Sequence, residues 1–388
     1  MKNLHFVMTY DPNTPFRYEQ IKQVAKAELH LHFRGCLTPQ LLHNMMLPLK
    51  QNSPAHYDHL LHRFPKPARE MIISSQQVAQ FLNEWCRLQD HEELEQLCLH
   101  HFNFSAPNDF FMTYLMTAGL WQEPEELYPL AHHVVHYLET HHIIHAEIIV
   151  SVTEYLMCGW STEQISRLLD YTKMRAAEKN IQILWIFDFV RNFPEAQGIK
   201  NLERLLEANI NSWVGITLGG DEAHYPARNF QTLYQLARQN NLRLTCHAGE
   251  HDSYQSVVDA VLLLQAERIG HGITASHHLK TMELLKQRGV TLEVCPTSNV
   301  KTLACSWPEH PARHLLTNGI TLSIASDDPG FFQTSLSKEL DLCMTRLDFT
   351  QDEIIKTLKQ GFISSFATDE SKEMMIRRFD QSLAQLSQ

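Results

Sequence analysis

The chain has 388 residues, of which 44% are hydrophobic and 20% are charged, so it can bury a large core and fits one α/β barrel or two ordinary domains. Its formal net charge of −11 argues against a nucleic-acid backbone as the main partner, because such sites need a basic surface. We therefore expect a small-molecule substrate that is neutral, or an anionic one held by a few local cations.

The cysteines and the apolar segments indicate in which cellular compartment the protein is found. The eight cysteines are scattered without CxxC spacing, which is typical of reduced thiols in a cytosolic protein. The N-terminus, MKNLHFVMTYDPNTPF, lacks an apolar signal core, and no apolar run approaches the length of a membrane span. The sequence predicts a soluble, cytoplasmic protein with no membrane contact and no evident need for a protein partner.

Eight short apolar runs rich in branched residues predict strands. They cover residues 27–33, 143–151, 181–190, 210–218, 242–248, 268–273, 291–296 and 321–326. Helical spacing lies between the later runs, and Ser161 and Gln164 form a capping box ahead of one predicted helix. This alternation predicts a (β/α)8 TIM barrel of the α/β class. An open doubly wound sheet is the alternative, but only a barrel places the eighth strand beside the first.

The connection from about residue 36 to 142 is far longer than a β/α unit requires. Val78, Phe81, Leu82 and Trp85 have helical spacing, so we expect extra helices that form a lid over the barrel mouth. From about residue 350 the pattern is typical of closing helices packed on the barrel. We find no repeat or linker, so residues 1–388 are predicted to form one domain, with the barrel beginning near residue 26.

Short polar motifs stand where several of the predicted strands end. His30 and His32 lie two apart in a strand and therefore face the same way, into the barrel mouth. His247 supplies a third imidazole and Asp327 a carboxylate. This donor set suits zinc and leaves a place for water. We predict one zinc ion per chain, although most of the 24 histidines are expected to be core or surface residues.

Three further residues lie beside these candidate ligands. A bound metal would make hydroxide available, and His271 could take its proton or hold it in line. Glu250, three residues beyond His247, is predicted to act as an acid above the metal rather than as a solvated loop residue. Asp328 adds a second carboxylate, for which orientation of a histidine is the alternative role. The whole series predicts a metal-dependent hydrolase.

Longer segments around these residues resemble the adenosine deaminase family. The similar segments are KAELHLHFRG (26–35), VGITLGGDE (214–222), CHAGE (246–250), ERIGHGI (267–273), EVCPTSN (293–299) and SDDPGFF (326–332). The resemblance covers nearly the whole chain from about residue 26, in the same order. It implies a cytoplasmic TIM-barrel deaminase that holds zinc with His30, His32, His247 and Asp327.

The resemblance also implies roles for single residues in the deamination of a 6-aminopurine. Glu250 would protonate ring N1 while hydroxide attacks C6, and His271 would orient or deprotonate that hydroxide. Asp328 would contact the purine or the attacking oxygen. Gly220 would offer its backbone N–H to the ring, where a side chain would clash. The products would be a 6-oxopurine and ammonia, or an alkylamine if N6 is substituted.

Arg34 departs from the family pattern, which places Asp, Glu or Asn before the glycine. A guanidinium suits a phosphate or a carboxylate, so Arg34 predicts a substrate with an anionic substituent, with Arg191 as a second candidate contact. Alternatively, Arg34 faces solvent or pairs with an acid of the lid. Ile149 and Thr217 replace an Arg and an Asp of many members, which we interpret as the exchange of a structural pair.

Two other functions are compatible with parts of the pattern. An amidohydrolase that cleaves a non-purine C–N bond would keep the metal site, but Gly220 and Glu250 match recognition of a purine ring. A non-catalytic binding protein is expected to lack Glu250, His271 or a metal ligand, and the sequence retains them all. Deamination of an aminopurine is therefore the preferred hypothesis.

Overall fold

The computed structural model describes residues 16–51, 57–104 and 107–386. Eight parallel strands follow one another around a sheet in chain order. They are β1 (Lys26–His32), β2 (Ile143–Val150), β3 (Gln182–Val190), β4 (Trp213–Gly219), β5 (Arg243–Ala248), β6 (Arg268–His271), β7 (Thr291–Val294) and β8 (Thr321–Ile324). The predicted strands are confirmed, with bounds shifted by at most a few residues.

The sheet closes into a barrel where the segment after β8 meets β1. Leu31 bridges Asp327, the His32 N–H donates to the Asp327 carbonyl (2.9 Å), and the Asp327 N–H donates to the His30 carbonyl (3.1 Å). The predicted (β/α)8 barrel is therefore confirmed. Closure brings residues that are about 300 positions apart in the sequence into one ladder, which an open sheet need not do.

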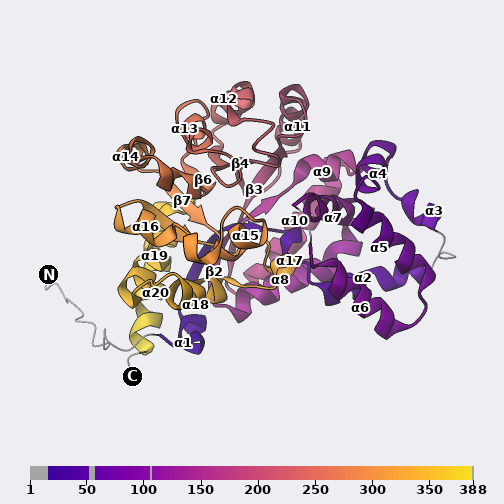
Figure 1. Ribbon diagram of the computed structural model, residues 1–388, viewed down its shortest axis with the longest axis horizontal. Coiled ribbons are helices and arrows are strands. Elements are labelled where there is room, and N and C mark those ends of the chain that lie inside the picture. The colour runs from indigo at the N-terminus through magenta and orange to yellow at the C-terminus, as the bar shows by residue number, and fades with distance from the viewer. Residues whose placement is uncertain (1–15, 52–56, 105–106, 387–388) are drawn as a thin grey trace, which may run out of the picture.

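Helices surround the barrel (Figure 1). Those between successive strands are α8 (Tyr128–Thr140), α9 (Val152–Met157), α10 (Thr162–Ala177), α11 (Glu195–Glu207), α12 (Gln231–Gln239), α13 (Tyr254–Leu262), α14 (Leu279–Arg288), α15 (Pro296–Lys301) and α16 (Ala312–Thr317), and the short α17 (Pro329–Phe332) follows β8. The predicted capping box begins α10: Ser161 Oγ accepts the Gln164 N–H (3.2 Å) and Gln164 Oε1 accepts the Ser161 N–H (2.9 Å). Strands covered in this way are buried on both faces, as β2 is along its whole length.

The long connection after β1 forms the expected extra helices, to the right of the barrel in Figure 1. They are α2 (Pro39–Gln51), α3 (Tyr57–Leu61), α4 (Lys66–Ile72), α5 (Gln76–Arg87), α6 (His91–His101) and α7 (Pro107–Gly119). Val78, Phe81, Leu82 and Trp85 are all buried on one side of α5, as their spacing predicts. The helix of this group that packs against α9 is α7.

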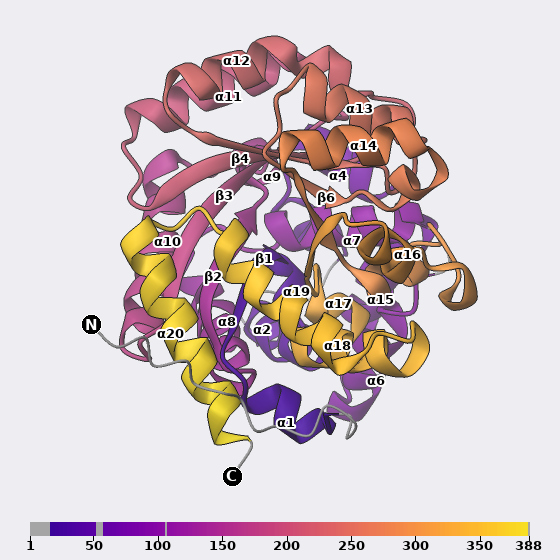
Figure 2. The same ribbon diagram turned by 90° about the vertical axis from the view of Figure 1, so that its left-hand side faces the viewer.

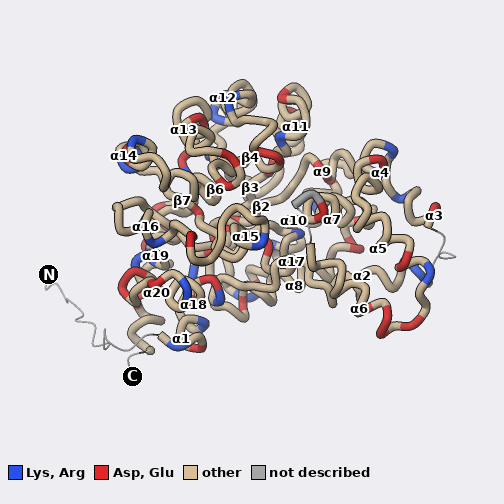
Figure 3. Tube along the Cα trace, in the orientation of Figure 1, with Lys and Arg blue, Asp and Glu red and all other residues tan. Residues whose placement is uncertain are grey.

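The C-terminal helices pack beside the first helix and the first strand of the described chain (Figure 2). They are α18 (Leu336–Arg346), α19 (Gln351–Ser364) and α20 (Asp369–Gln385), and the short α1 (Tyr18–Gln23) lies beside α18. α19 packs against β1 and β8, and Ser382 Oγ of α20 accepts the Ala25 N–H just before β1 (3.0 Å). Lys and Arg are spread over outer helices such as α12 and α14 (Figure 3). Within the described residues, no helix has the length and apolarity needed to cross a bilayer.

Candidate active site

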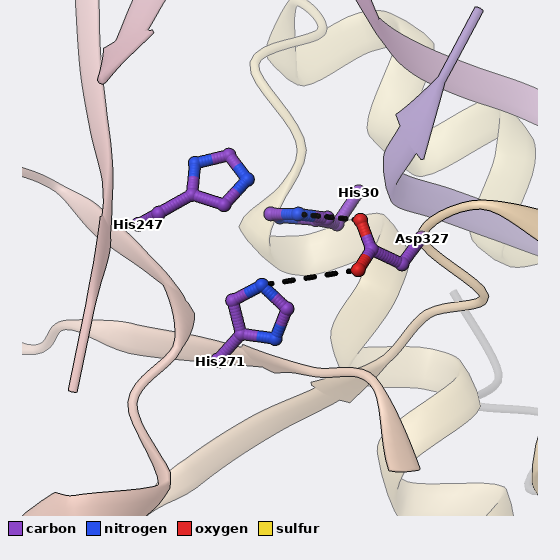
Figure 4. A group of neighbouring side chains, drawn as sticks. All are labelled: His30, His247, His271 and Asp327. Carbon is purple, nitrogen blue, oxygen red and sulfur yellow. Dashed lines mark ion pairs between the residues drawn. The ribbon is translucent and has the colours of Figure 1, made fainter. Parts of the chain in front are cut away.

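The carboxyl ends of β1, β5 and β8 bring the four predicted metal ligands together. His32 Nε2 lies 3.2 Å from His247 Nε2 and 3.2 Å from Asp327 Oδ1. His30 Nε2 lies 3.3 Å from the same carboxylate oxygen. Figure 4 shows His30, His247 and His271 gathered around Asp327. His30, His247, His271 and Asp327 each offer one ligand atom within 4.8 Å of the others, and His32 joins this group through its contacts with His247 and Asp327.

The hydrogen bonds behind this cluster suit a metal. His30 Nδ1 lies 2.8 Å from Glu293 Oε2 and donates to it, which leaves the lone pair of Nε2 facing the cluster. Thr217 Oγ1 lies 3.2 Å from His247 Nδ1. His30 Nε2 and Asp327 Oδ1 are buried, and neither makes a hydrogen bond to a described residue. Buried polar atoms without partners are rare, so their convergence fits a cation with nitrogen and oxygen ligands, such as zinc.

Burial and neighbouring charges shift the pKa values of His247, Asp327 and Asp328 in different directions. Burial and the neighbouring imidazoles of His30 and His32 hold the pKa of His247 well below its usual range, so His247 is neutral, the form that binds metal. Burial opposes ionisation of Asp327, but contacts with His30 and His32 hold its pKa well below the ordinary value. Burial and the charge of Asp327 raise the pKa of Asp328 well above its usual range. Two adjacent carboxyl groups are thereby pushed toward opposite protonation states.

Asp328 lies against the end of β1 because residue 35 is glycine. A Cβ on Gly35 would fall 2.1 Å from Asp328 Oδ1 and 2.8 Å from its Cα. Asp327, the residue before it, has a left-handed φ of 63°, and His271 has a left-handed φ of 62°. Such φ values are uncommon for residues other than glycine, and they concentrate where surrounding structure holds a functional side chain in place.

A chain of hydrogen bonds fixes the tautomer of His271. The Ala312 N–H donates to His310 Nδ1 (3.3 Å), so neutral His310 carries its hydrogen on Nε2. His310 Nε2 donates to Asn299 Oδ1 (3.3 Å), and the Asn299 amide therefore donates to His271 Nδ1 (3.0 Å). Burial lowers the pKa of His310 to about 4 and also lowers that of His271, so both rings are neutral near pH 7. His271 consequently carries its hydrogen on Nε2.

The Nε2–H of His271 points between two carboxylates. It lies 3.5 Å from Glu250 Oε2 and 3.9 Å from Asp327 Oδ2. A nitrogen that carries hydrogen has no lone pair for a metal or for a proton. This arrangement favours His271 as a donor that orients an oxygen atom, one of the two roles expected from the sequence.

Asn299→Asp is expected to reverse this tautomer, because a carboxylate accepts hydrogen bonds from both His310 and His271. His271 would then carry its hydrogen on Nδ1 and present a lone pair to Glu250. We expect kcat to fall by about 10²-fold or more with little change in metal content, since a wrong tautomer disables a positioned imidazole. The kcat and the ¹⁵N chemical shifts of the His271 ring check this; unchanged ring shifts would contradict the hydrogen-bond chain.

Glu250 is held in place by Glu222, for which the sequence pattern predicts no role. Glu222, after β4, is buried, and its carboxylate accepts the backbone N–H groups of Gly249, Glu250 (3.1 Å) and His251 (3.2 Å). The Glu250 carboxylate accepts a hydrogen bond from Thr302 Oγ1 (3.1 Å). The loop after β5 therefore presents Glu250 on the same side of the cavity as His271 and the candidate ligands.

A cavity lies directly in front of these groups. It is lined by His32, Phe110, Phe111, Tyr114, Ser151, Glu154, Asp188, Val190, Gly219, Gly220, Glu222, His247, Glu250, His251, His271, Ser298, Thr302, Asp327 and Asp328. The aromatic rings come from α7, the extra helix nearest the barrel mouth. Among the described residues, no Lys or Arg lines this cavity.

Asp188 is a lining residue that the sequence analysis missed. It is the one charged residue of β3, and it is buried. Asp188 Oδ1 accepts the Gly219 N–H (2.7 Å) and Oδ2 accepts a hydrogen bond from Ser151 Oγ (3.2 Å). Burial raises its pKa. A carboxylate near the carboxyl end of a buried apolar strand was the signal that could have identified it.

Gly220 lies at the cavity wall, as its predicted contact with the ring requires. Its φ is +98°, and a Cβ there would fall 2.4 Å from Asn192 Oδ1. Both the backbone conformation and the close approach therefore require glycine. Its role in binding a purine stays a prediction.

Arg34 is buried away from the cavity lining. It forms an ion pair with Glu154, which is partly buried, and donates to the Tyr114 carbonyl (2.9 Å). The guanidinium also stacks over the rings of Tyr114 (4.2 Å) and Tyr155 (5.0 Å). The structure thus shows the alternative in which Arg34 pairs with an acid, although this acid follows β2 and does not belong to the lid.

The other departures from the family pattern are also structural contacts. Arg191 is fully buried and donates to the backbone carbonyls of Leu218 (2.9 Å) and His247, so it is not among the residues that line the cavity. Thr217 stands behind His247, as described above. Ile149 packs in a small apolar cluster with Ile186 and other residues.

Removal of Arg34 is expected to act on stability. Arg34→Ala leaves the Glu154 carboxylate without its partner in a partly buried site, and should lower the free energy of unfolding by about 3 kcal/mol. The double variant Arg34→Met with Glu154→Leu should recover most of this loss, because no unpaired charge remains. Chemical denaturation of the three proteins measures both effects. An unchanged unfolding curve for Arg34→Ala, together with weaker binding of anionic aminopurines, would contradict the structural role and would show that Arg34 binds the substrate.

Comparisons with known proteins agree with this geometry. The family model for adenosine deaminase matches residues 83–382. An adenine deaminase of Psychrobacter cryohalolentis is 26% identical over 368 residues, which cover 94% of this chain and 98% of that protein. An aminodeoxyfutalosine deaminase of Streptomyces avermitilis is 28% identical over 288 residues, which cover 72% of this chain and 79% of that protein. The crystal structure of an adenine deaminase from Arthrobacter aurescens matches with a TM-score of 0.77 at 24% identity, over 92% of this chain and 98% of that one.

Proposed function

The chain belongs to the adenosine deaminase family and is a deaminase-type hydrolase, and we propose that it removes the 6-amino group of a neutral aminopurine with the help of zinc. The single observation that carries the proposal is the convergence of two buried atoms that make no hydrogen bond, His30 Nε2 and Asp327 Oδ1, with two more imidazoles beside Glu250. The relatives are named for different aminopurines, which supports a small purine substrate. Because these names differ in the group attached to the purine, the lining of the cavity is the guide to that group.

We assign the zinc to His30, His32, His247 and Asp327. When bound, zinc lowers the pKa of a water molecule toward neutrality and so supplies a nucleophile at pH 7. Glu293 supports the assignment, because its hydrogen bond to His30 Nδ1 directs the lone pair of Nε2 into the cluster. His271 is left out of the ligand set because the Asn299 hydrogen bond places the hydrogen of His271 on Nε2.

The surrounding residues supply the remaining steps of the hydrolysis. We propose that Glu250 donates a proton to ring N1, which makes C6 more electrophilic, while the Nε2–H of His271 orients the attacking oxygen. Asp328, whose pKa is raised by burial and by Asp327, contacts the purine or that oxygen. The Gly220 N–H would bind the ring edge. Water adds at C6, the proton of the added hydroxyl group passes to the 6-amino group, the bond from C6 to that exocyclic nitrogen breaks, and ammonia leaves the 6-oxopurine.

The lining of the cavity favours an uncharged substrate. Carboxylates line it at six positions, Glu154, Asp188, Glu222, Glu250, Asp327 and Asp328, and no Lys or Arg does so among the described residues. Arg34, the basis of the anionic-substituent hypothesis, is already neutralised by Glu154. A phosphate would therefore meet carboxyl groups and no free Lys or Arg side chain, so we propose a neutral base or nucleoside derivative.

The test is turnover of an aminopurine panel by zinc-loaded protein, followed by loss of the 6-amino absorbance and by release of amine. The panel contains adenine, adenosine, deoxyadenosine, N6-methyladenosine and AMP. We expect turnover of neutral members and a lower kcat/KM for AMP than for adenosine. A preference for AMP would overturn the neutral-substrate proposal. Inactivity across the panel with metal bound would favour hydrolysis of a non-purine C–N bond.

A further inference from the structure

An apolar chamber opens from the cavity between the extra helices and the barrel. Its apolar lining consists of Met71 from α4, Phe111, Met112 and Leu115 from α7, Met157 from α9, Val190 at the end of β3, and Phe193 after β3. We call this chamber the apolar annex. Its volume is about 370 Å³, whereas the cavity in front of the candidate ligands measures only about 80 Å³ by the same measure. Most of the space available to a ligand therefore lies in the annex.

The annex and the cavity form one continuous site. Six residues line both: Phe111, Glu154, Val190, Gly220, Glu222 and His251. None of the candidate metal ligands lines the annex. The metal-binding residues thus stand at one end of the combined site, and the annex lies at the other end, beyond Gly220.

This placement decides which part of a purine would face the annex. The reaction requires C6 at the metal end. N9 lies on the five-membered ring, across the ring fusion from C6, so a group attached to N9 extends away from the metal. A nucleoside is substituted at N9, and its sugar is therefore the part that leads toward the annex.

The chemistry of the annex favours an apolar occupant. Three carboxylates lie at its edge, and each already has a partner: Glu154 pairs with Arg34, Glu222 accepts three loop N–H groups, and Asp221 pairs with His224 (2.9 Å). Methionine side chains are flexible and adapt to bulky apolar groups, and they supply three of the seven apolar lining residues.

From these observations we propose that the substrate is a 6-aminopurine nucleoside whose sugar carries an uncharged, apolar group that fills the annex. The inference rests on the proposed function, because it takes the orientation of the purine from deamination at C6. It predicts that efficiency rises with the apolar size of the group at the 5′ position, since each methylene removed from water favours binding.

The experiment compares kcat/KM for adenine, adenosine, 5′-methylthio-5′-deoxyadenosine and 5′-phenylthio-5′-deoxyadenosine. We expect at least a 10-fold increase from adenosine to the phenylthio compound. Met157→Trp, which fills part of the annex, should reduce this ratio by at least 10-fold. Met174→Trp, at an exposed methionine of α10, is the matched control and should leave the ratio unchanged. A ratio near one, or a higher kcat/KM for AMP than for the phenylthio compound, would overturn the proposal.

A binding measurement separates failure of the annex from failure of the deaminase assignment. Calorimetric titration of the Glu250→Gln protein with the same compounds should give a Kd that falls by at least 10-fold from adenosine to the phenylthio compound. If Kd falls in this way but the wild type turns over none of the compounds, the deaminase assignment is wrong and the proposal that the annex binds an apolar group is supported. If affinity does not depend on size, the annex proposal is wrong.

Discussion

Glu250→Gln should lower kcat for aminopurine deamination by about 10²–10⁴-fold, with zinc still bound at close to one ion per chain. The amide cannot give a proton to ring N1, but it keeps the size of the carboxylate. Thr302 Oγ1 can still donate to the amide oxygen, and Glu222 still holds the loop through its backbone N–H groups. The substitution therefore removes one proton without dismantling the site.

The measurement pairs kcat with metal content. The matched control is Asp252→Asn on the same loop, because Asp252 is not among the cavity-lining residues and its Oδ1 accepts only a local N–H, from Ser253 (2.7 Å). The control should keep the wild-type kcat. If Glu250→Gln retained kcat within a few-fold of the wild type, proton donation would have to be assigned to another group, and Asp328 would be the next candidate.

The second large effect is expected from substitutions in the metal cluster. The loss of metal affinity should be larger for a ligand than for the residue behind it. His247→Ala removes one of four donors and should reduce activity to that of metal-free protein. Glu293→Gln removes the negative charge behind His30 and turns one of the two oxygens that face His30 and Arg268 into an NH2 group, so it should weaken metal affinity by about 10–100-fold while leaving all four donors in place. Added zinc should therefore restore Glu293→Gln to near the wild-type kcat, but it should not restore His247→Ala.

Zinc affinity, measured by competition with a chromophoric chelator, tests this order directly. His277→Ala, an exposed histidine next to the sixth-strand loop, is the control and should bind zinc as the wild type does. Full zinc occupancy in His247→Ala would contradict the proposed ligand set, and it would equally contradict the alternative set of His30, His247, His271 and Asp327. Failure of zinc to rescue Glu293→Gln would instead mean that Glu293 supports the fold.

The barrel and the residues around its mouth can be predicted from the amino-acid pattern alone. Periodicity and branched side chains located the eight strands, because strands buried on both faces are continuously apolar. The carboxyl ends of parallel barrel strands meet at one face, so polar residues that end different strands must converge there. This topological rule brings His30, His247 and Asp327 together without knowledge of any contact.

The contacts of the individual side chains could not be predicted, because they depend on how separate elements pack. Arg34 was assigned to a substrate anion from its chemistry, but it pairs with Glu154, which is 120 positions away. The tautomer of His271 depends on Asn299 and His310, and the position of Glu250 depends on Glu222 after another strand. Sequence spacing specifies which way a residue faces within its own element. Its hydrogen-bond partner and its exposure are set by the packing of separate elements, which local periodicity does not encode.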